Sequence, residues 1–125
     1  MSHSQPIRVL IVDDHASFRS TLVTVLSLQQ DIQVVGQAAD GKGICNLCAQ
    51  LRPDVVLMDL HMPQVNGIEA TRQIRGQFPE IQVIVLTAFQ EGTLIEQVFQ
   101  AGAAAYLLKN ATLEEIADTI RAAAL

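Results

Sequence analysis

The sequence contains little cysteine and little charge. Two cysteines among 125 residues do not form a disulfide framework. Charged residues make up 17% of the chain, below the usual ~25%, which argues against a disordered tail or linker. The 8 Lys and Arg residues are outnumbered by 13 Asp and Glu residues, and the net charge is -5. We therefore expect no nucleic-acid-binding surface on this domain, since such a surface needs clustered basic residues.

Long apolar runs are also absent. No run approaches the ~18–20 residues that a membrane-spanning helix needs. The first six residues, Met-Ser-His-Ser-Gln-Pro, lack the charged and apolar regions of a signal peptide. These absences predict a cytoplasmic protein that does not bind a membrane. The length, with 50% hydrophobic residues, fits one domain with one core, which we place at residues 7–125 after a tail at 1–6.

What is present is an alternation of two patterns. Short runs rich in Val, Ile and Leu predict strands that are buried on both faces. They cover Ile7–Val12, Ile32–Ala38, Asp54–Met58, Ile81–Leu86 and Ala103–Leu108. After each run, apolar residues recur at helical spacing, as in Phe18, Leu22, Val25, Leu26; Ile44, Leu47, Cys48, Leu51; Ala70, Ile74, Phe78; Leu94, Val98, Ala101; and Leu113, Ile116, Ile120.

Turn and cap residues support these boundaries. Asn66 and Glu69 are spaced as a helix-capping pair, Pro79 closes the third helix, and Gly102 stands where a C-cap glycine belongs. A strand–helix unit repeated five times predicts an α/β fold, (βα)5 and doubly wound. We expect a five-stranded parallel sheet of order 2-1-3-4-5 with helices on both faces.

Polar residues stand where the predicted strands end. Asp13 and Asp14 end the first strand, Asp59 the third, Thr87 the fourth and Lys109 the fifth. Ligands of open α/β sheets bind at this edge, beside the point where the strand order reverses. Three carboxylates there repel one another unless cations compensate, which Lys109 and a hard divalent ion such as Mg²⁺ would do. With a phosphoryl group completing the magnesium shell, the pattern favours phosphoryl transfer to an aspartate.

Each of these residues also has a simpler interpretation when taken alone. An aspartate after a strand is often a helix N-cap, Thr87 alone suits a loop, and Lys109 alone suits a solvated surface. Four strand ends with matching chemistry favour the functional interpretation.

Four segments resemble the receiver domain of bacterial two-component response regulators. They are Leu10-Ile11-Val12-Asp13-Asp14-His15, Asp59-Leu60-His61-Met62-Pro63-Gln64-Val65-Asn66-Gly67, Leu86-Thr87-Ala88 and Tyr106-Leu107-Leu108-Lys109. The resemblance extends from Ile7 to near the end of the chain. The run from Asp13 to Arg19 is most similar to the subfamily that carries a C-terminal helix-turn-helix DNA-binding domain.

The resemblance implies a role for each site residue. Asp59 is the phosphoacceptor. Asp14, Asp59 and the backbone carbonyl of His61 bind Mg²⁺ directly, and Asp13 assists through water. Thr87 bonds a phosphoryl oxygen and moves toward it on activation.

Further roles follow from the same resemblance. Lys109 pairs with the phosphoryl group, and the small Ala88 leaves room for the phosphoryl donor. Tyr106 is the aromatic switch residue, and its burial changes as the threonine moves. The side chains of His61 and Phe89 tune dephosphorylation.

The implied function is that of a phosphorylation switch rather than an enzyme. A sensor histidine kinase or phosphotransfer protein supplies the phosphoryl group, and the domain catalyses only its own phosphotransfer and slow dephosphorylation. The switch would control an output, which we expect to be transcription through a DNA-binding domain outside this chain, and phosphorylation can produce a homodimer.

Alternative functions fit less well. A receiver that signals without phosphate would have lost an acidic residue or the lysine, and none is lost. A flavodoxin needs a Ser/Thr/Gly-rich loop after the first strand, and a haloacid-dehalogenase-type phosphatase needs D-x-D there.

Three further features bear on these expectations. Many receivers have a cis proline after the lysine, where this chain has Asn110, and a non-proline cis bond costs about 2.5–4 kcal/mol. Cys45 and Cys48 form C-x-x-C within a predicted helix, which favours core packing over metal binding. His15 adjoins the acidic pair, and we expect it at the surface.

Overall fold

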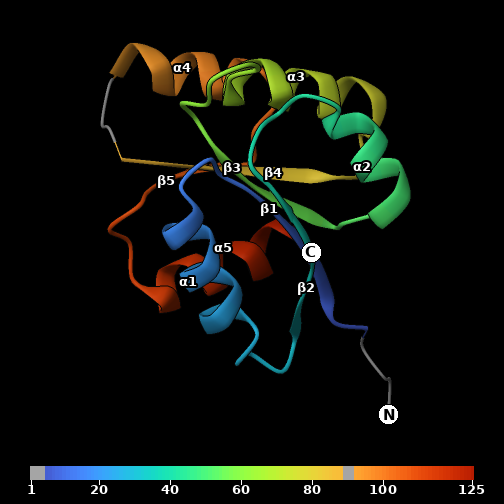
Figure 1. Cartoon of the computed structure of the whole chain (residues 1–125), viewed down its shortest axis with the longest axis vertical. Coiled ribbons are helices and arrows are strands. Elements are labelled where there is room, and N and C mark those ends of the chain that lie inside the picture. The colour runs from blue at the N-terminus through green and yellow to red at the C-terminus, as the bar shows by residue number, and fades with distance from the viewer. Residues whose placement is uncertain (1–4, 89–91) are drawn as a thin grey trace.

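The computed structural model describes residues 5–88 and 92–125. Strands and helices alternate along the whole described chain (Figure 1). The strands are β1 (Ile7–Val12), β2 (Ile32–Ala38), β3 (Val55–Asp59), β4 (Gln82–Thr87) and β5 (Ala105–Leu108). The helices are α1 (Ala16–Leu26), α2 (Ile44–Leu51), α3 (Gly67–Gln77), α4 (Gly92–Gln100) and α5 (Leu113–Ala123).

All strand pairs are parallel, and their order is β2-β1-β3-β4-β5. This is the predicted doubly wound arrangement. The strand order reverses between β1 and β3, so these two strands lie side by side with their carboxyl ends at the same edge. The pairing of Val12 with Met58 places Asp13 and Asp59 next to each other across that boundary.

The first two strands have the predicted bounds, and the other three differ. Both β3 and β4 begin and end one residue later than predicted, so that Asp59 and Thr87 are the last residues of strands rather than the first residues of loops. Backbone pairing explains the difference, because Asp59 pairs with Leu86 and Thr87 pairs with Leu108. The last strand begins at Ala105 instead of Ala103.

Helices cover both faces of the sheet, with α2, α3 and α4 on one side and α1 and α5 on the other (Figure 1). Two apolar clusters fill the layers between helices and sheet. Val56, Met58 and Val83 point to the three-helix face, whereas Val55 and Leu57 point to the two-helix face. Alternate residues of one strand thus enter different layers, which is why these strands are apolar without interruption.

Local capping fixes the helix ends. Asn66 accepts a hydrogen bond from the Glu69 backbone N–H at 2.9 Å, as the sequence predicts. Thr112 and Glu115 form a reciprocal capping box at the start of α5. Gly102 follows α4 with a φ of +107°, a conformation that favours glycine. None of the described helices is long and apolar enough to cross a membrane.

Candidate functional site

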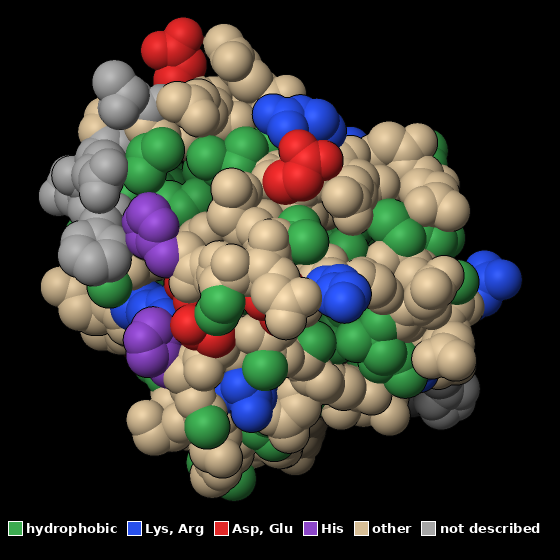
Figure 2. Space-filling view, turned by 45° about the horizontal axis from the view of Figure 1, so that its top comes forward, with side chains coloured by type: hydrophobic (Ala, Val, Ile, Leu, Met, Phe, Trp, Pro, Cys, Tyr) green, Lys and Arg blue, Asp and Glu red, His purple; other side chains and the backbone are tan. Residues whose placement is uncertain are grey.

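The carboxyl edge of the sheet brings together the side chains predicted from the strand ends. Asp13 follows β1, Asp59 and Thr87 end β3 and β4, and Lys109 follows β5. Asp13, Asp59 and Thr87 are 2%, 4% and 0% exposed. In Figure 2, acidic side chains lie partly covered by their neighbours, beside basic and histidine side chains. The fold therefore buries two carboxylates where the sequence predicts a phosphoryl site.

The ammonium group of Lys109 contacts both buried carboxylates. Its Nζ lies 2.7 Å from Oδ2 of Asp13 and 3.4 Å from Oδ1 of Asp59. The ring of Phe18 lies against the ammonium, with its centroid 4.7 Å from Nζ, within the range of a cation–π interaction. One oxygen of each carboxylate thus contacts the lysine, and the second oxygen of Asp59 accepts no hydrogen bond from the described residues.

His15 lies at the surface, as the sequence predicts, and its ring also belongs to this cluster. Its side chain is 66% exposed, but Nδ1 lies 3.1 Å from Asp14 Oδ1, 3.3 Å from Asp13 Oδ1 and 3.9 Å from Asp59 Oδ2. Its backbone N–H also donates to Asp13 Oδ1 at 2.8 Å. The histidine is therefore both solvent-facing and in contact with the acidic centre.

The environment of Asp59 disfavours its charged form. Burial is the largest cause, the Asp13 charge and the Asp14 carboxyl act in the same direction, and the Lys109 ammonium opposes them. Together they raise the pKa of Asp59 from 3.8 to about 6. The single positive charge of Lys109 therefore does not balance the negative charges of the aspartates around it.

The site fits a divalent cation. Oδ2 of Asp59 and Oδ1 of Asp14 are buried atoms that accept no hydrogen bond from the described residues. Asp13, Asp14, His15 and Asp59 each offer one donor atom, and these four atoms lie within 4.8 Å of one another. Unpaired carboxylate oxygens that converge in this way suit a hard cation, which would supply the missing positive charge.

The raised pKa of Asp59 predicts how pH affects stability without metal. A carboxyl whose pKa is higher in the folded chain than in the unfolded chain binds its proton more tightly when folded. Protonation therefore stabilises the fold, and this contribution is lost as pH rises through about 6. In the presence of a chelator, the free energy of unfolding of the wild type should fall by about 1 kcal/mol relative to that of Asp59→Asn between about pH 5 and pH 7.5. Urea denaturation of both proteins measures this difference, and a difference independent of pH would contradict the prediction.

A loop next to the site is held by Asp40, a residue that no sequence pattern singles out. The Asp40 carboxylate accepts backbone N–H groups of Lys42, Gln64 and Val65 at 2.9–3.1 Å. Burial raises the pKa of Asp40, but these hydrogen bonds outweigh it and lower the pKa overall. Asp40 thereby ties the loop after β2 to the loop between β3 and α3, which also contains His61. No sequence motif indicates this role, because the partners are 24 and 25 residues away.

Arg19 and Phe18 were also missed as site residues. Arg19 donates to the carbonyl of Asp13 at 2.6 Å and to the side chain of Gln37 at 2.9 Å. This contact fixes the backbone where β1 ends. Phe18 was assigned only to the core, yet its ring also packs on Lys109. The helical spacing that predicts α1 reveals neither contact.

The other predicted residues lie around the same edge. Ala88 is exposed and lines a shallow depression with Phe18 and Lys109. Tyr106 lies on β5, half-buried against the three-helix layer. His61 is exposed, and Phe89 lies outside the described residues. The described residues contain no cis peptide bond, so Asn110 follows Lys109 through a trans bond.

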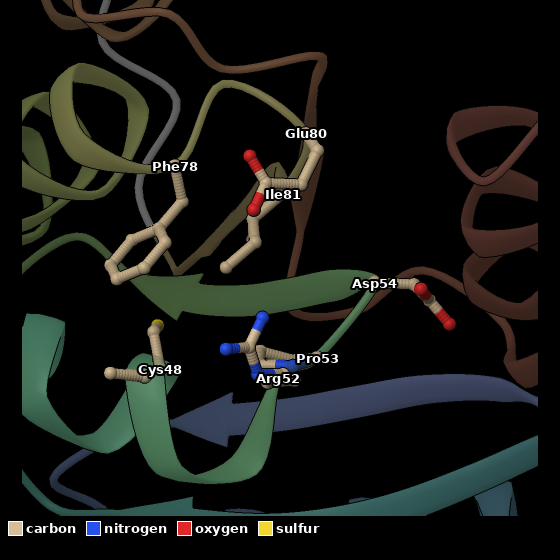
Figure 3. A pocket seen from close by; sticks show the side chains of 8 residues that line it. Cys48, Arg52, Pro53, Asp54, Phe78, Glu80 and Ile81 are labelled. Carbon is tan, nitrogen blue, oxygen red and sulfur yellow. The ribbon is translucent and has the colours of Figure 1, made fainter.

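A separate cavity of about 160 Å³ lies at the opposite edge of the sheet, where β3 and β4 begin. Figure 3 shows its lining, which includes Cys48, Arg52, Phe78 and Glu80. Burial raises the pKa of Cys48 to about 11, so its thiol remains protonated and unreactive. Both cysteines are free, and Cys48 packs in the core, as the sequence predicts. This cavity holds none of the predicted site residues.

Comparisons with known proteins agree with this geometry. The sequence model of the response regulator receiver domain matches residues 9–121. The transcriptional regulatory protein LiaR of Bacillus subtilis is 48% identical over 117 residues, which make up 94% of this chain and 56% of LiaR. The chain thus spans just over half the length of this curated relative.

Solved structures have the same fold. The signal receiver domain of the response regulator NarL from Mycobacterium tuberculosis is 33% identical, with a TM-score of 0.86 over 94% of this chain and 98% of that one. A LuxR-family two-component response regulator from an Aurantimonas species is 32% identical, with a TM-score of 0.88 over 94% of this chain and 84% of that one. The buried acidic edge, the strand order and these matches lead to one assignment: the chain belongs to the response regulator receiver domain family and is a signalling domain of two-component systems.

Proposed function

We propose that this domain accepts a phosphoryl group on Asp59 from the phosphohistidine of a sensor histidine kinase or phosphotransfer protein. The observation that carries the proposal is the state of the Asp59 carboxylate. It is 4% exposed, Lys109 contacts its Oδ1, and its Oδ2 accepts no hydrogen bond from the described residues. A nucleophilic oxygen with an unused lone pair beside a fixed cation suits attack on phosphorus.

In the transfer step, an oxygen of Asp59 forms a bond to phosphorus while the bond from phosphorus to the donor histidine nitrogen breaks. The electron pair of that bond returns to the imidazole. The Lys109 ammonium, 2.7 Å from Asp13 and 3.4 Å from Asp59, lies where it can pair with a phosphoryl oxygen. The shallow depression beside Ala88 gives the donor access from solvent.

Magnesium is the ion proposed for the acidic centre. Asp14, Asp59 and the backbone carbonyl of His61 would hold it, with Asp13 bound through water. When bound, Mg²⁺ supplies positive charge that offsets the carboxylates and the oxygens of the transferred group. The unpaired oxygens of Asp14 and Asp59 support this assignment.

Phosphorylation would act as a switch because it adds charge beside buried polar groups. Thr87, wholly buried at the end of β4, would bond a phosphoryl oxygen, and the half-buried Tyr106 on β5 would change its burial in response. Shifting the ratio of active to inactive conformation from 1:99 to 99:1 takes about 5.5 kcal/mol of differential binding. New charge-assisted bonds to Thr87 and Lys109 would supply part of it. In this scheme, His61 and Phe89 tune the rate of dephosphorylation.

Transcription is the proposed output, acting through a DNA-binding domain outside this chain. The similarity to LiaR, a transcriptional regulatory protein of which the matched residues cover 56%, supports it. A homodimer formed on phosphorylation and a cytoplasmic location belong to the same proposal. The domain would catalyse only its own phosphotransfer and slow dephosphorylation.

The proposal predicts magnesium-dependent labelling of the wild-type protein. After incubation with a small acyl phosphate, intact-protein mass spectrometry should show a gain of one phosphoryl group with Mg²⁺ and little gain in a chelator. A phosphorylated kinase or phosphotransfer protein can replace the small donor. No gain from either donor, together with no measurable binding of Mg²⁺, would contradict the proposal and favour the phosphate-independent receiver.

A further inference from the structure

The acidic centre contains a nitrogen donor in addition to its carboxylates. Oδ1 of Asp13, Oδ1 of Asp14 and Oδ2 of Asp59 lie 3.3, 3.1 and 3.9 Å from Nδ1 of His15. The ammonium of Lys109 contacts the other oxygen of Asp13 and of Asp59. Each of the two buried carboxylates therefore has one oxygen beside Lys109 and the other beside His15.

The distances from Nδ1 to these oxygens are close to those between donors of one metal ion. With bonds of about 2.1 Å, adjacent donors of an octahedral ion lie about 3.0 Å apart and opposite donors about 4.2 Å apart. Nδ1 of His15 lies 3.1 Å from Oδ1 of Asp14, close to the adjacent value, and 3.3 Å from Oδ1 of Asp13, the residue proposed to reach the ion through water. It lies 3.9 Å from Oδ2 of Asp59, between the two values.

The ring nitrogen Nδ1 of His15 faces this space, with Nζ of Lys109 3.4 Å away. In the tautomer that carries its proton on Nε2, Nδ1 has a free lone pair, which can accept from the ammonium or bind a metal ion. In that tautomer, Nδ1 and the carboxylate oxygens beside it are all acceptors. Oδ2 of Asp59 and Oδ1 of Asp14 accept no hydrogen bond from the part of the chain that the structure describes. A group of converging acceptors needs a cation among them.

We propose that His15 is a further protein ligand of this centre, bound through Nδ1, and that it makes the site favour divalent transition ions over Mg²⁺. This inference rests on the proposed function, because it uses the same metal site. Imidazole nitrogen suits ions such as Co²⁺, Ni²⁺ and Zn²⁺, whereas Mg²⁺ prefers oxygen ligands and retained water. The ion bound to the domain would thus follow the supply of transition metals as well as that of magnesium.

Two histidine-to-alanine variants, one at His15 and one at His61, test this proposal. His15→Ala removes the imidazole, and the His15 side chain makes no capping hydrogen bond to α1, so the helix start is preserved. The backbone N–H that donates to Asp13 is also retained. His61→Ala is the control, since it removes the ring of the other histidine among the described residues and keeps the backbone carbonyl proposed as a magnesium ligand.

The first measurement is pulsed electron paramagnetic resonance of Mn²⁺ bound to the protein with isotopically labelled histidine. We expect coupling to a directly bound nitrogen in the wild type and in His61→Ala, and its loss in His15→Ala. The second is calorimetric titration with Ni²⁺ and with Mg²⁺. The preference for Ni²⁺ over Mg²⁺ should fall about tenfold or more in His15→Ala.

Each outcome separates this inference from the proposed function. If Mn²⁺ binds and Asp59 becomes phosphorylated, but no nitrogen coupling appears, the histidine is not a ligand and the inference is wrong. Coupling that survives in His15→Ala, or an unchanged preference for Ni²⁺, overturns it as well. If neither Mn²⁺ nor Mg²⁺ binds and no phosphoryl group is gained, the proposed function fails together with the inference.

Discussion

Asp59→Asn should lose phosphoryl uptake entirely while it gains stability in the absence of metal. The amide has nearly the same shape as the carboxylate but cannot form the acyl phosphate. It also removes a charge that burial and the neighbouring Asp13 disfavour, as the raised pKa of Asp59 shows. We expect labelling by the acyl phosphate below the detection limit of intact-protein mass spectrometry. In a chelator at neutral pH, the free energy of unfolding should rise by about 1–3 kcal/mol.

The matched control is Asp54→Asn, which changes the aspartate that directly precedes the same strand. Asp54 is exposed at the opposite edge of the sheet, where it accepts the backbone N–H of Arg8 at 2.9 Å, and the amide oxygen can still accept this bond. This variant should be labelled as fully as the wild type. Full labelling of Asp59→Asn, or equal loss in both variants, would show that Asp59 is not the acceptor.

Gly67→Ala should destabilise the domain by about 2–4 kcal/mol and weaken phosphoryl uptake. Gly67 is the buried first residue of α3, and its backbone N–H donates to the carbonyl of Leu60 at 2.8 Å. A Cβ built at this position would overlap the backbone oxygen of Asp59 and lie 2.9 Å from Cα of Leu60. Because both contacts involve backbone atoms, the steric clash can be removed only if the end of β3 moves relative to α3. That movement would displace the phosphoacceptor itself.

Gly76→Ala is the control on the same helix. No atom lies within 4 Å of a Cβ at Gly76, which is exposed within α3. Alanine should therefore raise stability by about 0.5–1 kcal/mol, as is usual in a helix interior. Urea denaturation of both variants makes the comparison. If Gly67→Ala lost no more stability than Gly76→Ala, the close approach of α3 to β3 would not constrain the fold.

Short-range patterns were sufficient to predict the architecture. The uninterrupted apolar runs predicted five buried strands, and the bounds of β1 and β2 were correct because turn residues flank both. The capping role of Asn66 and the C-cap glycine at Gly102 were also predicted, since each depends on neighbours a few residues away. The ends of β3 and β4 were placed one residue early, because only pairing with the next strand shows that Asp59 and Thr87 still belong to the ladder.

By itself, the sequence determined the parallel sheet, its strand order, and the gathering of Asp13, Asp59, Thr87 and Lys109 at one edge. These results follow from periodicity and from the rule that the carboxyl ends of parallel strands share an edge. Only the tertiary structure decided which oxygen of each carboxylate contacts Lys109, and that His15 approaches the remaining oxygens. It also decided that Asp40 ties two loops together and that no side chain fits at Gly67. These features depend on distances of a few ångströms between segments that are far apart in the chain, and no local pattern of residue types encodes such distances.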